Sequence, residues 1–484
     1  MFNRPHILNK LTRKKIWTTG LGLALIAVLA FPGYLLARPD DATRKNTNSW
    51  LIKDGYVMTM DGQLGNLDGG DVLVERGKIT RIGQHISAPK GVQTIDAKGT
   101  IVMPGLIDNH RHAWEGIVRG QAAGATFGQY FQQVLLGSGA KTTPRDNYLG
   151  TRLSSYEALN AGVTTLLDWD NAAKTREHAK AGVDAMRDAG IRGVYAYGPP
   201  SSNTSGPHPV TQEDIDALYK YIGKQSSLMS MAIATNSPEL RPGTEDRFWT
   251  DVDRARALNL PITIHIAGFA PSRVPSTVQL LHDQGLLKND MTFVHANFLT
   301  EQDFKLIAEA GAFVSSSPEV ELQMGSIPSP IAKLRAAGVT STVSVDVPTA
   351  ISGDLFDQLR ILLQTGRNTQ QNSATPRPPQ LDLFASDVLP YATINAAKSL
   401  KMEDKIGSLV PGKQADLIMV RRDSMATFLA KPAEQLVQYA SPDDVDTVLV
   451  AGRIVKRAGM LVGIQDLAKL QREATAANKR LLEN

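Results

Sequence analysis

The sequence predicts an α/β protein, a (β/α)8 barrel of the TIM type with a small β-sandwich domain formed by both chain ends. From about residue 101 to residue 400, apolar runs of strand length alternate with amphipathic stretches of helix length. About eight such strand–helix repeats are typical of a (β/α)8 barrel. Hairpin-like patterns flank this region on both sides. A doubly wound open sheet would fit the same alternation, but no Gly-x-Gly-x-x-Gly follows the first strand, which favours the barrel.

The composition is that of an ordinary globular protein and excludes some classes of function. The chain has 484 residues, 42% of them apolar and 21% charged, which suffices for a large barrel and a smaller domain. Its formal net charge of +4 comes from five basic side chains in residues 1–15, which contain no acid, so we expect no nucleic-acid partner. There is no cysteine, so any transition-metal ligands are His, Asp or Glu.

Residues 1–37 are typical of a signal peptide or an N-terminal membrane anchor. The basic residues 1–15 precede an almost uncharged apolar run, residues 16–37, which is long enough to span a bilayer. A basic flank stays on the cytoplasmic side, so we expect an exported domain, periplasmic or extracellular. The sequence leaves open whether the segment is cleaved or tethers the protein to the membrane.

Short apolar runs separated by Gly and Asp turns predict the two parts of the β-sandwich, residues 46–100 and residues 401–465. Examples are WLIKDGYVMTM in the first part and TVLVAGRIVKRAG in the second. Such punctuation is typical of strands and hairpins. Residues 466–484 predict an amphipathic C-terminal helix.

The barrel, residues 101–400, is expected to contain eight strands and the helices between them. The predicted strands are Ile101–His110, Gly162–Asp168, Ile191–Tyr197, Leu228–Ala234, Pro261–Ile266, Met291–His295, Ala312–Ser316 and Val339–Asp346. The clearest helical patterns are Asp146–Ala161, His178–Ala189, Glu213–Gln225 and Glu301–Ala310.

The chemistry is concentrated where these strands end. His110 and His112 are two residues apart, so on a strand both imidazoles point to one side, about 6–7 Å apart along the backbone. His265, His295 and Asp346 each end a later strand, and active sites of such barrels lie at the carboxyl ends of the strands. A chance His-x-His pair is common, but five such residues at one face predict a metal site.

Four stretches together resemble the amidohydrolase superfamily, in its cytosine-deaminase-like and chlorohydrolase-like branch. PGLIDNHRH is similar to the first-strand motif of that family, and GSLVPGKQADLIMV is similar to its closing motif. VHANFLT and VSVDVPTAISGDLF are similar to the motifs of its sixth and eighth strands. The resemblance extends from about Trp50 to Gly463.

The resemblance implies one divalent metal ion, zinc or, as the alternative, iron, held by His110, His112, His265 and Asp346. It places His295 beside the attacking water or the substrate. Binuclear members add a carbamylated Lys at the end of the fourth strand, but LMSMAIATN, residues 228–236, has no Lys. One metal ion is therefore the expectation.

The sequence also departs from the family pattern. Deaminases of the branch carry a Glu three residues after the fifth-strand His, where this chain has Gly268, and often a His where it has Phe298. Glu319 or Glu321, just past the seventh strand, is a candidate for the missing acid, although both would also fit a solvated loop. Three further residues could contact a planar substrate or simply support the rim: Trp114, Glu115 and Asn297.

These observations predict a metal-dependent hydrolase that cleaves a non-peptide carbon–nitrogen bond in a small amide, cyclic amide or amidine. A metal-activated water would attack, with Asp346 as general base and His295 assisting. The first alternative is an aminohydrolase that deaminates an amino-substituted heterocycle, ranked second because of Gly268 and Phe298. The second alternative is a non-catalytic binding protein of the same fold, which the retained ligand positions disfavour. We expect a small-molecule substrate and a homo-oligomer.

Overall fold

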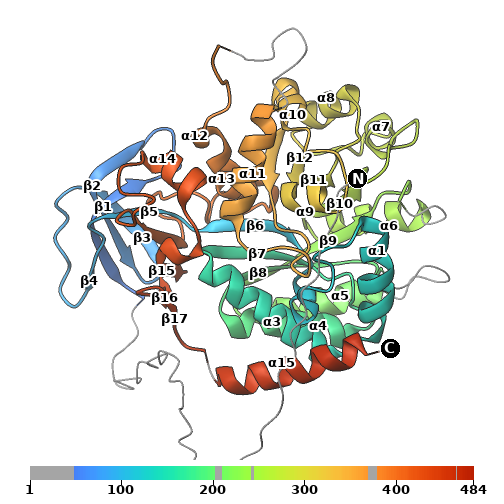
Figure 1. Ribbon diagram of the computed structural model, residues 1–484, viewed down its shortest axis with the longest axis horizontal. Coiled ribbons are helices and arrows are strands. Elements are labelled where there is room, and N and C mark those ends of the chain that lie inside the picture. The colour runs from blue at the N-terminus through green and yellow to red at the C-terminus, as the bar shows by residue number, and fades with distance from the viewer. Residues whose placement is uncertain (1–47, 202–209, 241–244, 369–378, 465, 484) are drawn as a thin grey trace, which may run out of the picture. The chain divides into compact units, whose positions relative to one another are not determined.

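The computed structural model describes residues 48–201, 210–240, 245–368, 379–464 and 466–483. The predicted signal peptide or anchor, residues 1–37, lies outside these ranges. Within them, no helix combines the length and the apolar character needed to cross a membrane. From Thr47 onward the chain forms one unit built around two sheets (Figure 1).

The first sheet is the predicted eight-stranded parallel barrel. Its strands are β6 (Leu106–Arg111), β7 (Val163–Trp169), β8 (Arg192–Tyr197), β9 (Met229–Asn236), β10 (Ile262–Ile266), β11 (Met291–His295), β12 (Phe313–Ser316) and β13 (Thr340–Val343), paired in chain order. The last strand returns to the first through a parallel bridge between Arg111 and Asp346. There the His112 N–H donates to the Asp346 carbonyl (2.8 Å) and the Asp346 N–H donates to the His110 carbonyl (3.0 Å). These bonds close the barrel at the site.

Helices surround the barrel (Figure 1). They include α3 (Pro144–Asn160), α4 (Arg176–Ala189), α5 (Gln212–Ile222), α6 (Glu245–Ala257), α7 (Thr277–Asp283), α8 (Glu301–Glu309), α9 (Pro318–Gln323), α10 (Ile331–Ala337), α11 (Leu355–Asn368), α12 (Ala385–Val388), η3 (Leu389–Ala392) and α13 (Ile394–Ser399). Capping boxes start α3 at Thr143 and α8 at Thr300, where the hydroxyl and a downstream Asp satisfy backbone N–H groups reciprocally. The four helices predicted from the sequence are all present, and no end is shifted by more than three residues.

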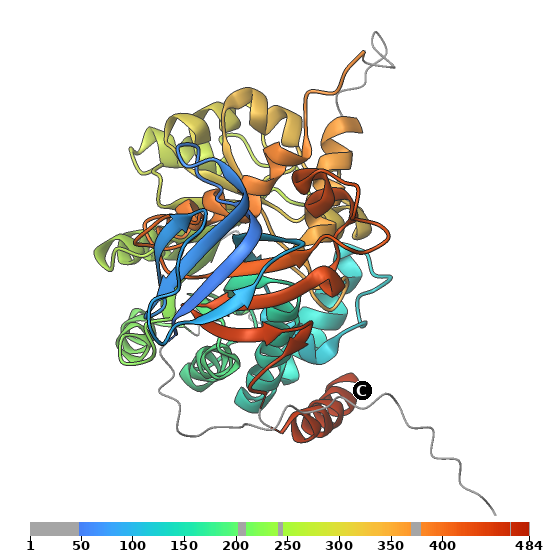
Figure 2. The ribbon, with the colours of Figure 1, turned by 90° about the vertical axis from the view of Figure 1, so that its left-hand side faces the viewer.

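The second sheet is mixed, has nine strands and joins the two ends of the chain. Its strands are β1 (Trp50–Met58), β2 (Asn66–Glu75), β3 (Lys78–Gly83), β4 (Gln93–Asp96), β5 (Thr100–Pro104), β14 (Leu417–Arg421), β15 (Val445–Val450), β16 (Arg453–Arg457) and β17 (Met460–Leu461). β5 pairs with β14 antiparallel, so early and late strands lie side by side (Figure 2). Val57, Val72, Val102, Leu417 and Leu449 belong to a core separate from that of the barrel.

The predicted first barrel strand, Ile101–His110, is in fact two strands in two different sheets. β5 lies in the end sheet, and β6 opens the barrel after a break at Gly105. A Cβ at position 105 would lie 2.1 Å from Oγ1 of Thr164. The close approach of these two segments of the chain therefore requires glycine. The apolar run spans both strands because both are fully buried, which hides the break in the sequence pattern.

An insertion of short helices follows β6 and forms one wall above the barrel. It comprises η1 (Ala113–Val118), α1 (Phe127–Tyr130), η2 (Phe131–Ser138) and α2 (Gly139–Lys141). The predicted C-terminal helix, α15 (Leu467–Leu482), is present and packs against it: Asn478 donates to the Ile117 carbonyl at 2.7 Å. The remaining short helices, α14 (Pro432–Glu434), η4 (Gln435–Tyr439) and η5 (Pro442–Asp444), lie between β14 and β15.

Candidate metal centre

The barrel brings together all five residues that the sequence placed at strand ends. His110 lies in β6, His112 follows it, His265 lies in β10, and His295 ends β11. Asp346 does not end a strand as predicted: β13 ends at Val343, and Asp346 lies three residues beyond it. The backbone turns there: φ is +69° at Asp346 and +71° at His295. Positive φ is uncommon for such residues and often occurs at functional sites.

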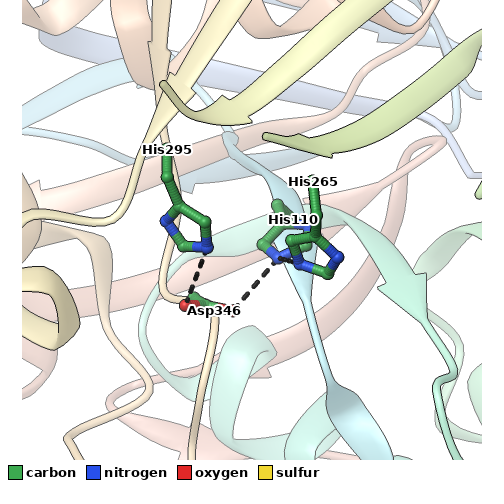
Figure 3. Close-up of side chains that lie close together, drawn as sticks. All are labelled: His110, His265, His295 and Asp346. Carbon is green, nitrogen blue, oxygen red and sulfur yellow. Dashed lines mark hydrogen bonds and ion pairs between the residues drawn. The ribbon is translucent and has the colours of Figure 1, made fainter. Parts of the chain in front are cut away.

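Figure 3 shows His110 and His295 directed at the carboxylate of Asp346, with His265 beside His110. Nε2 of His110 lies 3.0 Å and Nε2 of His112 lies 3.3 Å from Oδ1 of Asp346. Nε2 of His265 lies 3.3 Å from Nε2 of His110, and Nε2 of His295 lies 3.7 Å from Oδ2 of Asp346. One ligand atom each from His110, His265, His295 and Asp346 lie within 4.8 Å of one another.

This donor set fits a tetrahedral divalent metal ion. Zinc–nitrogen bonds of about 2.0–2.1 Å at a tetrahedral angle put two nitrogen ligands about 3.3 Å apart. That is the separation of the Nε2 atoms of the buried His110 and the partly buried His265. Both nitrogens can bind one cation when neither carries a proton.

The protonation states match the same ion. Burial lowers the pKa of His110 to about 4 and, together with the neighbouring imidazoles, holds the pKa of His265 well below its usual value. Burial opposes ionisation of Asp346, but hydrogen bonds from His110 and His112 outweigh it and hold that pKa well below the usual range. Burial also lowers the pKa of His112, but the bond to Asp346 and its charge raise it to about 9. The site thus combines the carboxylate of Asp346 with neutral imidazoles at His110 and His265, and it favours positive charge at His112.

Three of the imidazoles are oriented by a partner on the nitrogen that faces away from the centre. Nδ1 of His112 lies 2.7 Å from the Trp169 carbonyl, and Nδ1 of His265 lies 3.2 Å from Oδ1 of Asn236. Nδ1 of His295 lies 3.2 Å from Oε1 of Glu321. Such outer partners fix the tautomer of metal-ligating histidines and leave Nε2 directed inward.

A buried ion pair below the cluster fixes the backbone that carries Asp346. Nε of Arg111 donates to Oδ2 of Asp108 at 2.7 Å, and Nη2 donates to the Gly353 carbonyl at 2.7 Å. The other oxygen of Asp108 accepts the N–H of Val345, next to Asp346, at 3.2 Å. The Arg between the two histidines therefore ties β6 to the loop after β13.

A cavity of about 530 Å³ opens onto the cluster and has mostly apolar walls. Phe127 and Phe269 stack in its wall, with ring centroids 4.2 Å apart and planes inclined by 11°, and Phe269 meets the edge of His295. The other lining residues are His112, Tyr130, Phe131, Leu135, Asn171, Ser201, Asn236, Leu240, His265, Gly268, Ala270, Met324, Asp346 and Val347. Sequence reasoning missed the aromatic wall, although three aromatic residues between Thr126 and Gln132 could have indicated it.

Among the secondary candidates, only Glu321 hydrogen-bonds a side chain of the cluster, that of His295. Trp114 and Glu115 are buried in η1: Trp114 donates to Asn171 at 2.6 Å, and Glu115 accepts from the Tyr130 hydroxyl at 2.6 Å. Burial raises the pKa of Glu115 to about 8. Asn297 donates to the Ile327 carbonyl at 2.8 Å, and Glu319 accepts from Gln358 at 2.6 Å. Trp114 and Glu115 thus reach the cavity only through its lining residues Asn171 and Tyr130.

Comparison with known proteins gives a family match and similar curated proteins. The amidohydrolase family model matches residues 101–455. The chain is 30% identical over 421 residues to a 5-methylthioadenosine/S-adenosylhomocysteine deaminase of Symbiobacterium thermophilum, which covers 84% of this chain and 93% of the relative. It is 27% identical over 449 residues to a 5'-deoxyadenosine deaminase of Methanosarcina mazei, covering 89% of this chain and 98% of the relative.

Solved structures share the fold. An adenosine deaminase from Xanthomonas campestris with bound zinc superposes with a TM-score of 0.77 at 23% identity, over 89% of this chain and 98% of that one. The atrazine chlorohydrolase TrzN from Arthrobacter aurescens TC1, complexed with zinc, gives a TM-score of 0.75 at 22% identity, over 89% of this chain and all of that one.

Proposed function

This chain belongs to the amidohydrolase family, and we propose that it is a zinc-dependent aminohydrolase. The reaction would replace the amino group of a nitrogen heterocycle by the oxygen of water and release ammonia. One observation carries this proposal: a cluster of metal-ligand type lies at the floor of an aromatic-walled cavity.

The ion would be a single zinc held by His110, His112, His265 and Asp346. The group of donor atoms within 4.8 Å of one another contains His295 and not His112. We nevertheless assign His112, because its Nε2 lies 3.3 Å from Oδ1 of Asp346, the oxygen that His110 also faces, whereas His295 faces the other carboxylate oxygen at 3.7 Å. β9 ends in Asn236 and contains no Lys that would bridge a second ion. When bound, zinc lowers the pKa of water towards about 7 and polarises the carbon under attack.

Asp346 would transfer the proton in this reaction, and His295 would assist. The Asp346 carboxylate is held ionised, so it can accept a proton from the attacking water and pass it to the leaving nitrogen. His295 lies on the cavity side of Asp346, where Nε2 can hydrogen-bond the substrate ring or the departing amine. The leaving group then departs as neutral ammonia.

Deamination replaces amide hydrolysis as the preferred reaction. The sequence placed amide-type substrates first because Gly268 and Phe298 stand where deaminases carry Glu and His. The similar curated proteins favour the opposite order. They are deaminases of adenine-containing compounds, and the similarity extends over most of their length. The stacked Phe127 and Phe269 also favour a flat ring, because aromatic faces offer a large contact area to it.

The test is ammonia release by the purified, zinc-loaded protein. We would offer 5'-deoxyadenosine, methylthioadenosine, amino-substituted triazines and, for the rejected alternative, small cyclic amides. The proposal expects ammonia from at least one aminoheterocycle. It also expects a loss of at least about a thousandfold in His265→Ala, with no loss in the control His282→Ala, because His282 is an exposed residue of α7. Ring opening of the cyclic amides, followed as the new carboxylate by chromatography, with no ammonia from any aminoheterocycle would refute deamination.

A further inference from the structure

Position 268 has no room for a side chain. A Cβ there would lie 2.8 Å from Cβ, Cγ and Cδ2 of His295, closer than real Cβ atoms come to their neighbours. The segment is also fixed, because the Ser326 hydroxyl donates to the Gly268 carbonyl. The ring of His295 thus occupies the space into which an acidic side chain at 268 would project. In this chain, the role of the Glu that deaminases of the branch carry at this position must therefore fall to another residue.

His295 itself depends on one buried carboxylate. Its Nδ1 lies 3.2 Å from Oε1 of Glu321, while its Nε2 is directed at Oδ2 of Asp346 and the cavity. An imidazole with a carboxylate on Nδ1 keeps its proton on that side, so the Nε2 lone pair stays directed at the reacting centre. Phe269 contacts the ring edge-on but offers no hydrogen bond.

Glu321 is held in turn, and it does not line the cavity. It is fully buried in α9; Oε1 also accepts the Ser317 N–H at 2.9 Å, and Oε2 accepts from the Ser329 hydroxyl. Both carboxylate oxygens are engaged, so Glu321 cannot swing out to meet a substrate. It can act only through His295.

We propose that Glu321 is the positioning residue of this site: it fixes the His295 ring in the space left by Gly268, with Nε2 facing Asp346 and the substrate. The inference rests on the proposed aminohydrolase function for its kinetic part only. Glu319, two residues earlier on α9, supplies a matched control because its carboxylate bonds Gln358 instead.

The kinetic test is a double-mutant cycle between Glu321 and His295. We expect Glu321→Ala to lower kcat by about 10- to 100-fold, with KM and zinc content nearly unchanged. Glu321→Gln keeps an acceptor for Nδ1–H and should recover most of the rate, and Glu319→Ala should match the wild type. Because Glu321 acts through His295, adding Glu321→Ala to His295→Ala should cost almost nothing more. The proposal is wrong if the double mutant loses kcat by the product of the two single losses, or if the Glu321→Ala enzyme is as fast as the wild type.

A second readout needs no substrate. In protein labelled with ¹⁵N-histidine, nine imidazoles are visible, and His295→Ala identifies the signals of position 295. We expect a protonated Nδ1 in the wild type and in Glu321→Gln, and a changed tautomer in Glu321→Ala. A proton on Nε2 alone in the wild type would refute the inference. If ammonia release is absent from the wild type, the proposed function fails, and this spectrum still decides the role of Glu321.

Discussion

At the scale of single residues, Gly268 shows how a missing side chain can define a site. Its Cβ position lies within 2.8 Å of His295, so the glycine and the ring orientation depend on each other. At Gly124, by contrast, an added Cβ meets nothing within 4 Å. The two glycines therefore differ in what a methyl group would displace.

Replacing Gly268 by Ala should push His295 away from Asp346. We expect kcat to fall at least about tenfold with zinc retained, since a misplaced reacting group is costly even at small displacements. Gly124→Ala should leave kcat unchanged. Steady-state kinetics with metal analysis checks both, and a fully active Gly268→Ala enzyme would show that His295 is not confined.

Asp251, which lies outside the metal site, should make the free energy of unfolding depend on pH. Burial raises its pKa to about 6, although Arg247 and Gln212 oppose this. Unfolded Asp titrates near 3.9, so between pH 4 and 6 the folded state holds more protons than the unfolded state. This contribution to the free energy of unfolding is complete below about pH 4 and is lost as the pH rises to 6, about 3 kcal/mol in all.

Asp251→Asn should remove that pH dependence. The difference in unfolding free energy between mutant and wild type should therefore grow in favour of the mutant as the pH rises from 4 to 6. Urea unfolding of both proteins across this range measures it. Parallel pH profiles would contradict the raised pKa.

The sequence predicted which residues cluster but not the cavity wall, for physical reasons. His110, His265 and His295 lie at or near the ends of strands whose buried apolar runs are easy to recognise, and parallel strands bring their carboxyl ends together. Asp346 lies past its strand because a short loop, not the strand, carries it into the centre. Phe127 and Phe269 meet across the cavity from segments far apart in sequence, and no local pattern encodes that contact.

At the scale of elements, the pairing of β6 with the loop after β13 determines where Asp346 lies. Arg111 supports this pairing through Asp108 and the Gly353 carbonyl, with no exposure to solvent. The sequence alone did not indicate this role for Arg111. The histidines on either side of it were enough to account for the His-x-His motif, so the residue between them drew no separate interpretation.

Arg111→Met should destabilise the protein and weaken the site together. Removing one partner of a buried pair leaves Asp108 uncompensated and costs about 3–5 kcal/mol. The half-exposed Arg187, which pairs with Asp184 and Asp188, is the control, and Arg187→Met should cost less than about 1 kcal/mol. Chemical unfolding with zinc-affinity measurements checks both. Equal stability of the two variants would contradict the role of Arg111.

At the scale of the whole molecule, the two sheets are joined through a buried ion pair. Arg192 of β8 donates to both oxygens of Asp416, at 2.7 and 2.9 Å, next to β14. The sequence predicted both sheets correctly, because alternation of strands with helices and clusters of hairpins are local signals. It could not show that β5 and β14 pair, since 312 or more residues separate them.

Residues 1–37 lead to a proposal about location. We propose that the protein is exported, because a basic leader followed by an apolar run is the pattern of a secretory signal or anchor. In fractionated cells of the source organism, the protein should appear in the periplasmic, secreted or membrane fraction. The intact mass then shows whether the leader is removed. Recovery in the cytoplasm would contradict export.

We propose that one metal ion, held at the ends of the three barrel strands β6, β10 and β13, is required for the release of ammonia. The most direct measurement is a zinc titration of the metal-free protein, following ammonia release from the aminoheterocycle it turns over. We predict that activity rises linearly and stops rising at one zinc per chain. Activity that needs a second equivalent, or that does not depend on zinc, would contradict this claim.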